Sequence, residues 1–150
     1  SWRKGQSAVT TEVIDKLDRL NLSIMIAGLG LLAIGTLLGG VWANESWGRY
    51  WGWDPKETWS LITILVYSVV LHFRWIPQLR STWLNASVSL GAVASVIMTY
   101  FGVNYYLSGL HSYGAGDPIP VPSWVYIFTV VFVVLVAISG LVNRSRSWER

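Results

Sequence analysis

The chain has 150 residues, of which 53% are hydrophobic and only 13% are charged, whereas soluble domains carry about 25% charged residues. This balance excludes a disordered tail and indicates one compact body set in a membrane. The sequence contains no cysteine, which excludes a disulfide-stapled domain, a thiol enzyme and any cysteine-ligated zinc or iron–sulfur site. The net charge of +3 would suit a nucleic acid, but the positions of the charges argue against that partner.

Four uncharged stretches are long enough, or nearly so, to cross a bilayer, which takes about 20 residues. They predict an all-α membrane protein, because a backbone that faces lipid must satisfy its own hydrogen bonds. The second stretch is the shortest, and an arginine and a tryptophan at its end can extend it to 58–76. The predicted spans are Leu22–Ala43, Thr58–Phe73, Trp83–Leu107 and Ser123–Val142.

Lysine and arginine are distributed unequally between the two ends of these spans. Nine of the eleven lie near the termini or in the 74–82 loop, and only Arg49 and Lys56 lie on the other side. By the positive-inside rule, both termini are cytoplasmic and the 44–57 and 108–122 loops are external. The basic excess therefore reflects membrane topology, and we expect no nucleic-acid partner.

The predicted organisation has three parts. Residues 1–21 form a polar cytoplasmic lead-in, in which Thr11–Leu20 has the apolar spacing of a helix on the membrane surface. Residues 22–114 form a membrane domain with the first three spans. Residues 115–150 supply an external Pro-rich loop, the fourth span and a basic cytoplasmic tail.

The loop between the first two spans is rich in tryptophan, since five of the chain's ten tryptophans fall within residues 42–59. Trp42, at the end of the first span, suits an aromatic belt at the membrane interface. Trp47, Trp51 and Trp53 alternate instead with glycines, which let a flat ligand approach the backbone, while indoles offer broad apolar faces. A platform for a large planar amphipathic ligand and a plain interfacial belt both fit this composition.

Charged residues of the same loop also have two interpretations. Asp54 is followed by proline and, three residues on, by Glu57, which is the pattern of a capping box that opens the second span. Arg49 and Lys56 can pair with ligand carboxylates such as propionates, or with a neighbouring glutamate or lipid head groups.

The two histidines of the chain have different settings. His72 lies within the second span, about 21 Å from its external end, where ionisable residues are functional candidates; a hydrogen-bonded histidine beside Arg74 is the alternative. His111 follows the third span in an external loop, and a neutral imidazole there is a natural axial ligand for heme iron. An ordinary interfacial loop histidine is again the alternative. Together with the tryptophans, the histidines suggest a planar metal-containing ligand that passes from inside to outside.

At these residues the sequence resembles a known family. Residues 47–59 look like the WWD signature of heme-handling membrane proteins. Residues 40–45 and 109–114 resemble the CcsA/ResC type, the System II cytochrome c biogenesis family of holocytochrome c synthetases. The resemblance runs from Asp15 to Gly114, about two thirds of the chain.

The resemblance implies a heme exporter and cytochrome c heme lyase that presents heme b to the Cys-x-x-Cys-His segment of apocytochrome c. It implies that His111 is the external axial ligand of the iron and that His72 is a transmembrane heme ligand. No catalytic residue separate from the heme site is implied. The other implied heme-binding residues, which we call the WWD platform, are Trp47, Arg49, Trp51, Trp53 and Asp54.

Relatives of this type carry further histidines, whereas no histidine precedes Trp42 in this sequence. We therefore expect the chain to be the C-terminal portion of a longer synthetase, or to work with a segment or subunit that supplies the second external histidine. We expect it among the lipids of a bacterial inner membrane or a thylakoid. Two other functions stay open: a System I heme-handling protein, and a cofactor-free four-span scaffold.

Overall fold

The computed structural model describes residues 2–111 and 120–147, and it describes side chains within residues 9–111 and 120–142. The chain divides into two units, Ser1–Gly114 and Ala115–Arg150, which are described separately. The elements are α1 (Trp2–Trp47), α2 (Pro55–His72), the short 3-10 helices η1 (Phe73–Trp75) and η2 (Pro77–Leu79), α3 (Thr82–Ile97), the π-helical turn η3 (Met98–Gly102), α4 (Val103–Tyr106) and α5 (Ser123–Ser147).

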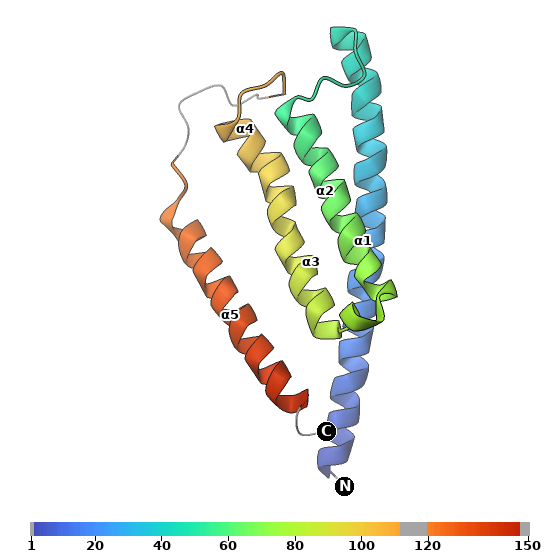
Figure 1. The fold of residues 1–150 in the computed structure, drawn as a ribbon, viewed down its shortest axis with the longest axis vertical. Helices are drawn as coiled ribbons and strands as arrows, with labels where there is room; N and C mark the ends of the chain where they lie inside the picture. The colour runs from blue at the N-terminus through green and yellow to red at the C-terminus, as the bar shows by residue number, and fades with distance from the viewer. Residues whose placement is uncertain (1, 112–119, 148–150) are drawn as a thin grey trace. The chain divides into compact units, whose positions relative to one another are not determined.

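In the first unit, α2 packs against both α1 and α3, and consecutive long helices run in opposite directions (Figure 1). The 48–54 loop and the end of α4 therefore lie at one end of the unit, which we call the tryptophan end. The 73–81 turn, with Arg74 and Arg80, lies at the other end, which we call the arginine end. In the second unit, the described residues include the helix α5.

Among the residues that the structure describes, four helices are long and apolar enough to cross a membrane, which confirms the predicted all-α protein with four spans. The fourth span agrees with the prediction residue for residue, and the third is shifted by one residue. The observed spans are Val9–Trp47, Pro55–Trp75, Thr82–Tyr106 and Ser123–Val142.

The first helix differs most from its prediction. Residues 11–20 do not form a separate element on the membrane surface, because they continue directly into the 46-residue helix α1. No proline interrupts the helix, which is about 69 Å long and so exceeds the roughly 30 Å thickness of bilayer hydrocarbon. It ends at Gly48, whose φ of +70° and hydrogen bond to the Asn44 carbonyl, at 2.8 Å, form a left-handed helix stop.

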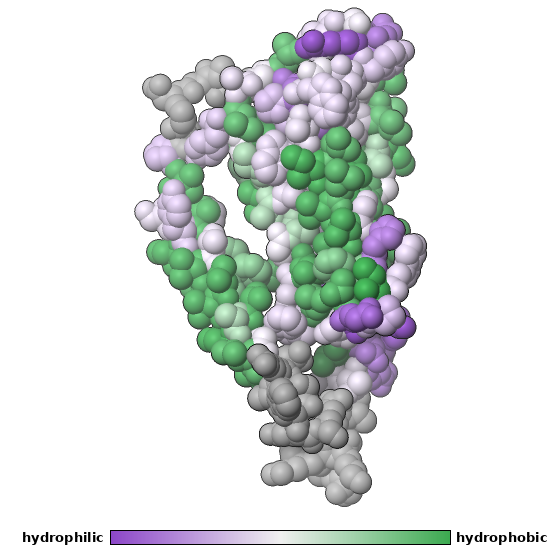
Figure 2. Space-filling model, viewed as in Figure 1, coloured by the Kyte–Doolittle hydropathy of each residue, from purple (hydrophilic) through white to green (hydrophobic). Residues whose placement is uncertain are grey.

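Few side chains are buried in the first unit. Met25, Val70 and Ala92 form the core where α1, α2 and α3 meet. Figure 2 shows hydrophobic side chains over the middle of this unit and hydrophilic ones toward its ends. Exposed apolar helices of this kind suit contact with lipid or with further membrane helices, since lipid tails are as apolar as leucine.

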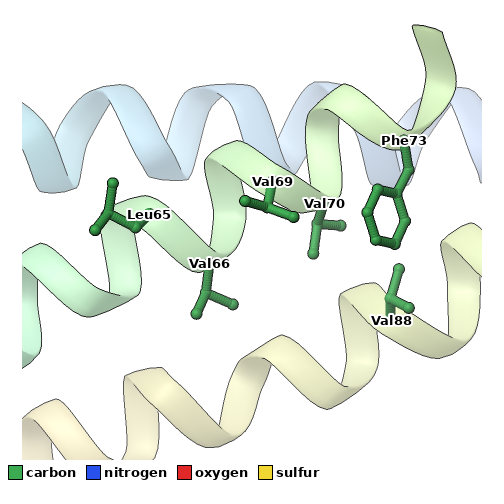
Figure 3. Close-up of a pocket in the computed structure, with 6 residues that line it drawn as sticks. All are labelled: Leu65, Val66, Val69, Val70, Phe73 and Val88. Carbon is green, nitrogen blue, oxygen red and sulfur yellow. The ribbon is translucent and has the colours of Figure 1, made fainter. Parts of the chain in front are cut away.

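Hydrogen bonds between small polar residues join the helices where apolar packing is thin. The Thr63 and Thr99 hydroxyl groups of α2 and η3 lie 2.9 Å apart, and Asn21 of α1 donates to the Ser89 hydroxyl of α3 at 3.1 Å. Such bonds are the usual means by which membrane helices associate. A groove of about 340 Å³ on the α2–α3 side is lined only by apolar side chains (Figure 3). These are Leu65, Val66, Val69, Val70, Phe73 and Val88.

An ion pair fastens α1 to the arginine end. The Asp18 carboxylate accepts two hydrogen bonds from the Arg74 guanidinium, at 2.7 and 2.8 Å, and the Asp18 carbonyl accepts a third at 3.2 Å. Both side chains are mostly buried, so this fork-like pair is shielded from solvent better than an ordinary surface ion pair.

Candidate functional site

Two loops that are distant in sequence meet at the tryptophan end, and Asp54 connects them. One oxygen of its carboxylate accepts a hydrogen bond from the Leu110 amide at 2.6 Å. The other lies 2.9 Å from Nδ1 of His111. Asp54 is only 7% exposed, and 17% of the His111 side chain is exposed. The carboxylate thus fixes both the backbone and the imidazole of the 107–111 loop.

The start of α2 holds this carboxylate in place. Asp54 is the N-cap residue, and its side chain also accepts from the Lys56 amide. In return, Oε2 of Glu57 accepts hydrogen bonds from the amides of Gly52, at 2.7 Å, and Asp54, at 3.2 Å. The predicted capping box is therefore confirmed. A side chain anchored at the first turn of a long helix has little freedom to move.

Gly109 allows the second loop to come this close. A Cβ atom at this position would clash with the Asp54 carboxylate and would lie 2.8 Å from Cδ of Pro55. Only glycine therefore lets the backbone of the 107–111 loop pass directly over the start of α2.

The surroundings of Asp54 decide its charge. Burial alone would raise the pKa of the carboxyl, but hydrogen bonds from His111 and from the Leu110 and Lys56 amides hold that pKa below its ordinary value of 3.8. The group is therefore a carboxylate at neutral pH. Because its pKa is lowered in the folded state, its stabilising contribution is present above about pH 4 and is lost as the pH falls through the folded-state pKa.

The contact with Asp54 sets the tautomer of His111. A carboxylate can only accept a hydrogen bond, so Nδ1 carries a proton, and whenever the ring is neutral it is Nε2 that has the lone pair. No side chain of the described residues forms a hydrogen bond to Nε2. A carboxylate behind the protonated nitrogen is the usual support of a metal-ligating histidine, because it fixes the ring and makes the ligand more basic.

Two tryptophans enclose the His111 ring. Trp47 contacts it edge to face, with ring centroids 4.8 Å apart, and the Trp42 ring lies 6.4 Å away. The two indoles also contact each other at 5.0 Å. Trp42 was predicted as part of an interfacial belt, because it lies at the end of the first span.

Trp51 and Trp53 form a second aromatic pair, with centroids 5.7 Å apart and rings nearly perpendicular. In the described part of the chain, neither ring contacts His111. Trp53 is 70% exposed and has a φ of +56°, a conformation that costs a non-glycine residue about 1–3 kcal/mol. The loop therefore leaves a large apolar indole face exposed on the protein surface, in a strained backbone conformation.

Cationic groups flank the aromatic residues. The Arg49 guanidinium lies against Gly52, where an added Cβ would approach its Cζ to 2.9 Å. The ammonium group of Lys56 donates to Oδ1 of Asn104 at 3.3 Å. The π-helical turn η3 precedes Asn104 and changes the helical register of α4, so it affects which α4 side chains face the site.

His72 lies far from this site, at the last residue of α2 and about 26 Å along the helix axis from Pro55. Its Nδ1 is 2.6 Å from the Ser68 carbonyl oxygen, which can only accept, so Nε2 again keeps the lone pair. The ring is exposed and contacts Trp75 edge to face at 4.7 Å. Within the described residues, no three histidine or acidic side chains are close enough to hold a bare metal ion.

Replacing Gly109 by alanine should detach the 107–111 loop from Asp54. Because the Leu110 amide would lose a hydrogen bond to a charged group, we expect its hydrogen exchange to accelerate about tenfold or more. Gly91→Ala is the matched control, since an added Cβ there meets nothing within 4 Å and alanine favours helix. Equal Leu110 exchange in the two variants would show that the loop does not depend on this close contact.

The comparisons with known proteins bear on this part of the chain. The family model described as cytochrome C assembly protein matches residues 3–111. Protein NrfI of Wolinella succinogenes is 56% identical over 107 residues, which are 71% of this chain and 12% of NrfI. The cytochrome c biogenesis protein CcsA of Cuscuta reflexa is 47% identical over 105 residues, which are 70% of this chain and 34% of that protein.

CcsA of Gloeobacter violaceus is 41% identical over 113 residues, which are 73% of this chain and 32% of that protein. The chain therefore spans about a third of the length of the CcsA relatives and much less of NrfI. The family match ends at His111, so α5 lies outside it. Since the family model covers most of the chain and these relatives are 41–56% identical to it over the aligned residues, the chain belongs to the cytochrome c assembly protein family.

Proposed function

We propose that this multi-pass membrane chain presents heme to apocytochrome c in System II cytochrome c biogenesis, with His111 as an axial ligand of the iron. Membership of the family supports a role in cytochrome c maturation. The observation that carries the finer proposal is the Asp54–His111 contact, which leaves the Nε2 lone pair available beside two indole rings. By the distribution of positive charge, this site faces the exterior.

The residues around His111 fit heme as the substrate. Heme is flat and apolar with two carboxylates, so it needs aromatic surface, an imidazole and cations at its edge. Trp47 stands beside the imidazole, and the exposed face of Trp53 adds apolar surface. Arg49 is the cation that we assign to the propionates.

The chain's own residues bind and orient heme, whereas the apocytochrome supplies the reacting groups. Each thiol of its Cys-x-x-Cys-His segment adds across a heme vinyl group, forming one S–C bond and one C–H bond without loss of atoms. Asp54 keeps the imidazole in one orientation, and the tryptophans limit access of water to the heme face. The site thus acts by positioning, and no separate acid or base is required from this chain.

His72 is the second proposed heme ligand, at the opposite end of α2. The separation of about 26 Å along the axis means that the two histidines cannot bind the same iron at once. His72 presents Nε2 on the exposed surface of the first unit, where another segment or subunit can complete a site. We propose that it receives heme on the way from the cytoplasmic side, and that the second external ligand also comes from outside this chain.

The His111→Gly variant tests ligation. In the complete protein or assembly that contains this chain, we expect purified samples to lose the Soret band, and added imidazole to restore part of it by filling the vacant ligand position. His72→Ala is the matched variant: it should lower heme loading in cells but bind heme that is supplied to the purified protein. Failure of imidazole to restore any heme in His111→Gly would contradict direct ligation.

An experiment can distinguish a heme-binding role of the tryptophans of the WWD platform from a role as an aromatic belt. Changing both Trp51 and Trp53 to phenylalanine removes aromatic area and two N–H donors, so we expect heme affinity to fall about twofold to tenfold. Trp124→Phe, in α5, is the control because Trp124 is also exposed, at 67%, but is not one of the residues of the WWD platform. Equal heme affinity in the two variants would favour the belt interpretation.

A further inference from the structure

A second cavity lies at the arginine end of the first unit, away from the proposed heme platform. Its volume is about 710 Å³, within the 300–1,000 Å³ range that is typical of ligand pockets. It is bounded by α1, by the 73–81 turn and by the start of α3. The polar residues in its wall are Asp18, Arg74, Arg80, Thr82 and Asn85, and Leu22 and Trp75 supply apolar surface.

The cavity has a net positive charge. The Arg74 guanidinium is neutralised by Asp18, with which it forms two hydrogen bonds. The Arg80 side chain has no hydrogen bond or ion pair to any described residue and is exposed. One full positive charge is therefore available to a bound anion.

The start of α3 adds to this positive potential. The helix has 16 residues and begins at Thr82, which lines the cavity. The Ser81 hydroxyl accepts from the Leu84 amide at 3.4 Å, and the helix dipole places partial positive charge at this end. The positive end of the dipole favours a phosphate or carboxylate group.

Asn85 gives evidence for a ligand that does not depend on charge. It is only 4% exposed and lines the cavity, yet its Oδ1 atom is buried without a hydrogen-bond donor from the described residues. An unpaired buried acceptor is unfavourable and uncommon in folded proteins. A molecule with both an anionic group and a hydroxyl donor would satisfy the arginine, the helix start and this amide together.

We infer that this cavity binds the head group of an anionic phospholipid of the phosphatidylglycerol kind. Its phosphate lies against Arg80 and the start of α3, and a head-group hydroxyl supplies the donor that Asn85 lacks. Trp75, at the end of the second span and 78% exposed, together with Leu22, accommodates the adjoining acyl chain. Basic pockets between spans at the cytoplasmic side are typical sites for such head groups.

The test measures lipid binding to the complete, detergent-purified protein by native mass spectrometry and by thermal unfolding. We expect phosphatidylglycerol to bind and raise the melting temperature, and phosphatidylcholine, which has no hydroxyl donor and no net charge, to do neither. Arg80→Gln should weaken phosphatidylglycerol binding about tenfold. Asn85→Leu should reduce the preference for phosphatidylglycerol without lowering the stability of the lipid-free protein, since it removes the unpaired acceptor but leaves Arg80 in place.

Lys16→Gln is the control, because it removes one positive charge from α1 at a residue that does not line the cavity. It should bind phosphatidylglycerol as the unchanged protein does. Equal binding of the two lipids, or equal loss in Lys16→Gln and Arg80→Gln, would overturn the inference. Stabilisation by inorganic phosphate alone, as large as that by the lipid, would indicate a free-anion site. Displacement of the lipid by hemin in an Arg80-dependent manner would indicate a heme-loading site instead.

Discussion

The Asp54 carboxylate joins the helical framework to the proposed heme site. It ends the tryptophan-rich loop by capping α2, and it fixes the 107–111 loop through the Leu110 amide and the His111 ring. The contacts of the 107–111 loop depend on the capping box, because the capping box sets the position of the carboxylate to which Leu110 and His111 bind. Gly109 completes the arrangement by leaving no side chain between them. The lowered pKa of Asp54 keeps this junction charged over the whole neutral range.

The length of α2 imposes the second constraint. It separates the two histidines by most of a bilayer thickness, yet each ring has its Nδ1 fixed by an acceptor and its Nε2 left with a lone pair. The same hydrogen-bonding arrangement at both histidines agrees with the proposed transfer of heme from one side of the membrane to the other. The apolar outer surface of the first unit gives room for the segments or subunits that would complete each site.

Much of the fold could be predicted because membranes restrict structure so strongly. Span length and the absence of charge identified all four helices, and the capping residues identified the start of α2. Hydropathy did not predict that the first helix already includes residues 2–21. It identifies segments that are apolar enough to lie in lipid, whereas this part of the helix is charged. The WWD platform was expected as one surface, but Trp47 lies with His111 and Trp51 pairs separately with Trp53.

The contact between Asp54 and His111 could not be predicted from the sequence. The two residues are 57 positions apart, with the helices α2 to α4 between them, and a capping box already explained the acidic residue. The contact of Trp42 with His111 and the π-helical turn before Asn104 depend in the same way on how α1, α2 and α3 pack. The residue types of the proposed site were recognisable in the sequence, whereas their pairing required the tertiary structure.

The most direct measurement is the heme content and midpoint potential of the complete protein that carries Asp54→Asn. Asparagine is also a good N-cap residue, so α2 should form normally while the negative charge behind His111 is lost. If Asp54 orients His111 and makes it more basic, the variant should lose heme or hold it at a higher midpoint potential. Unchanged heme content together with an unchanged potential would contradict the role of Asp54 and, with it, the proposed site.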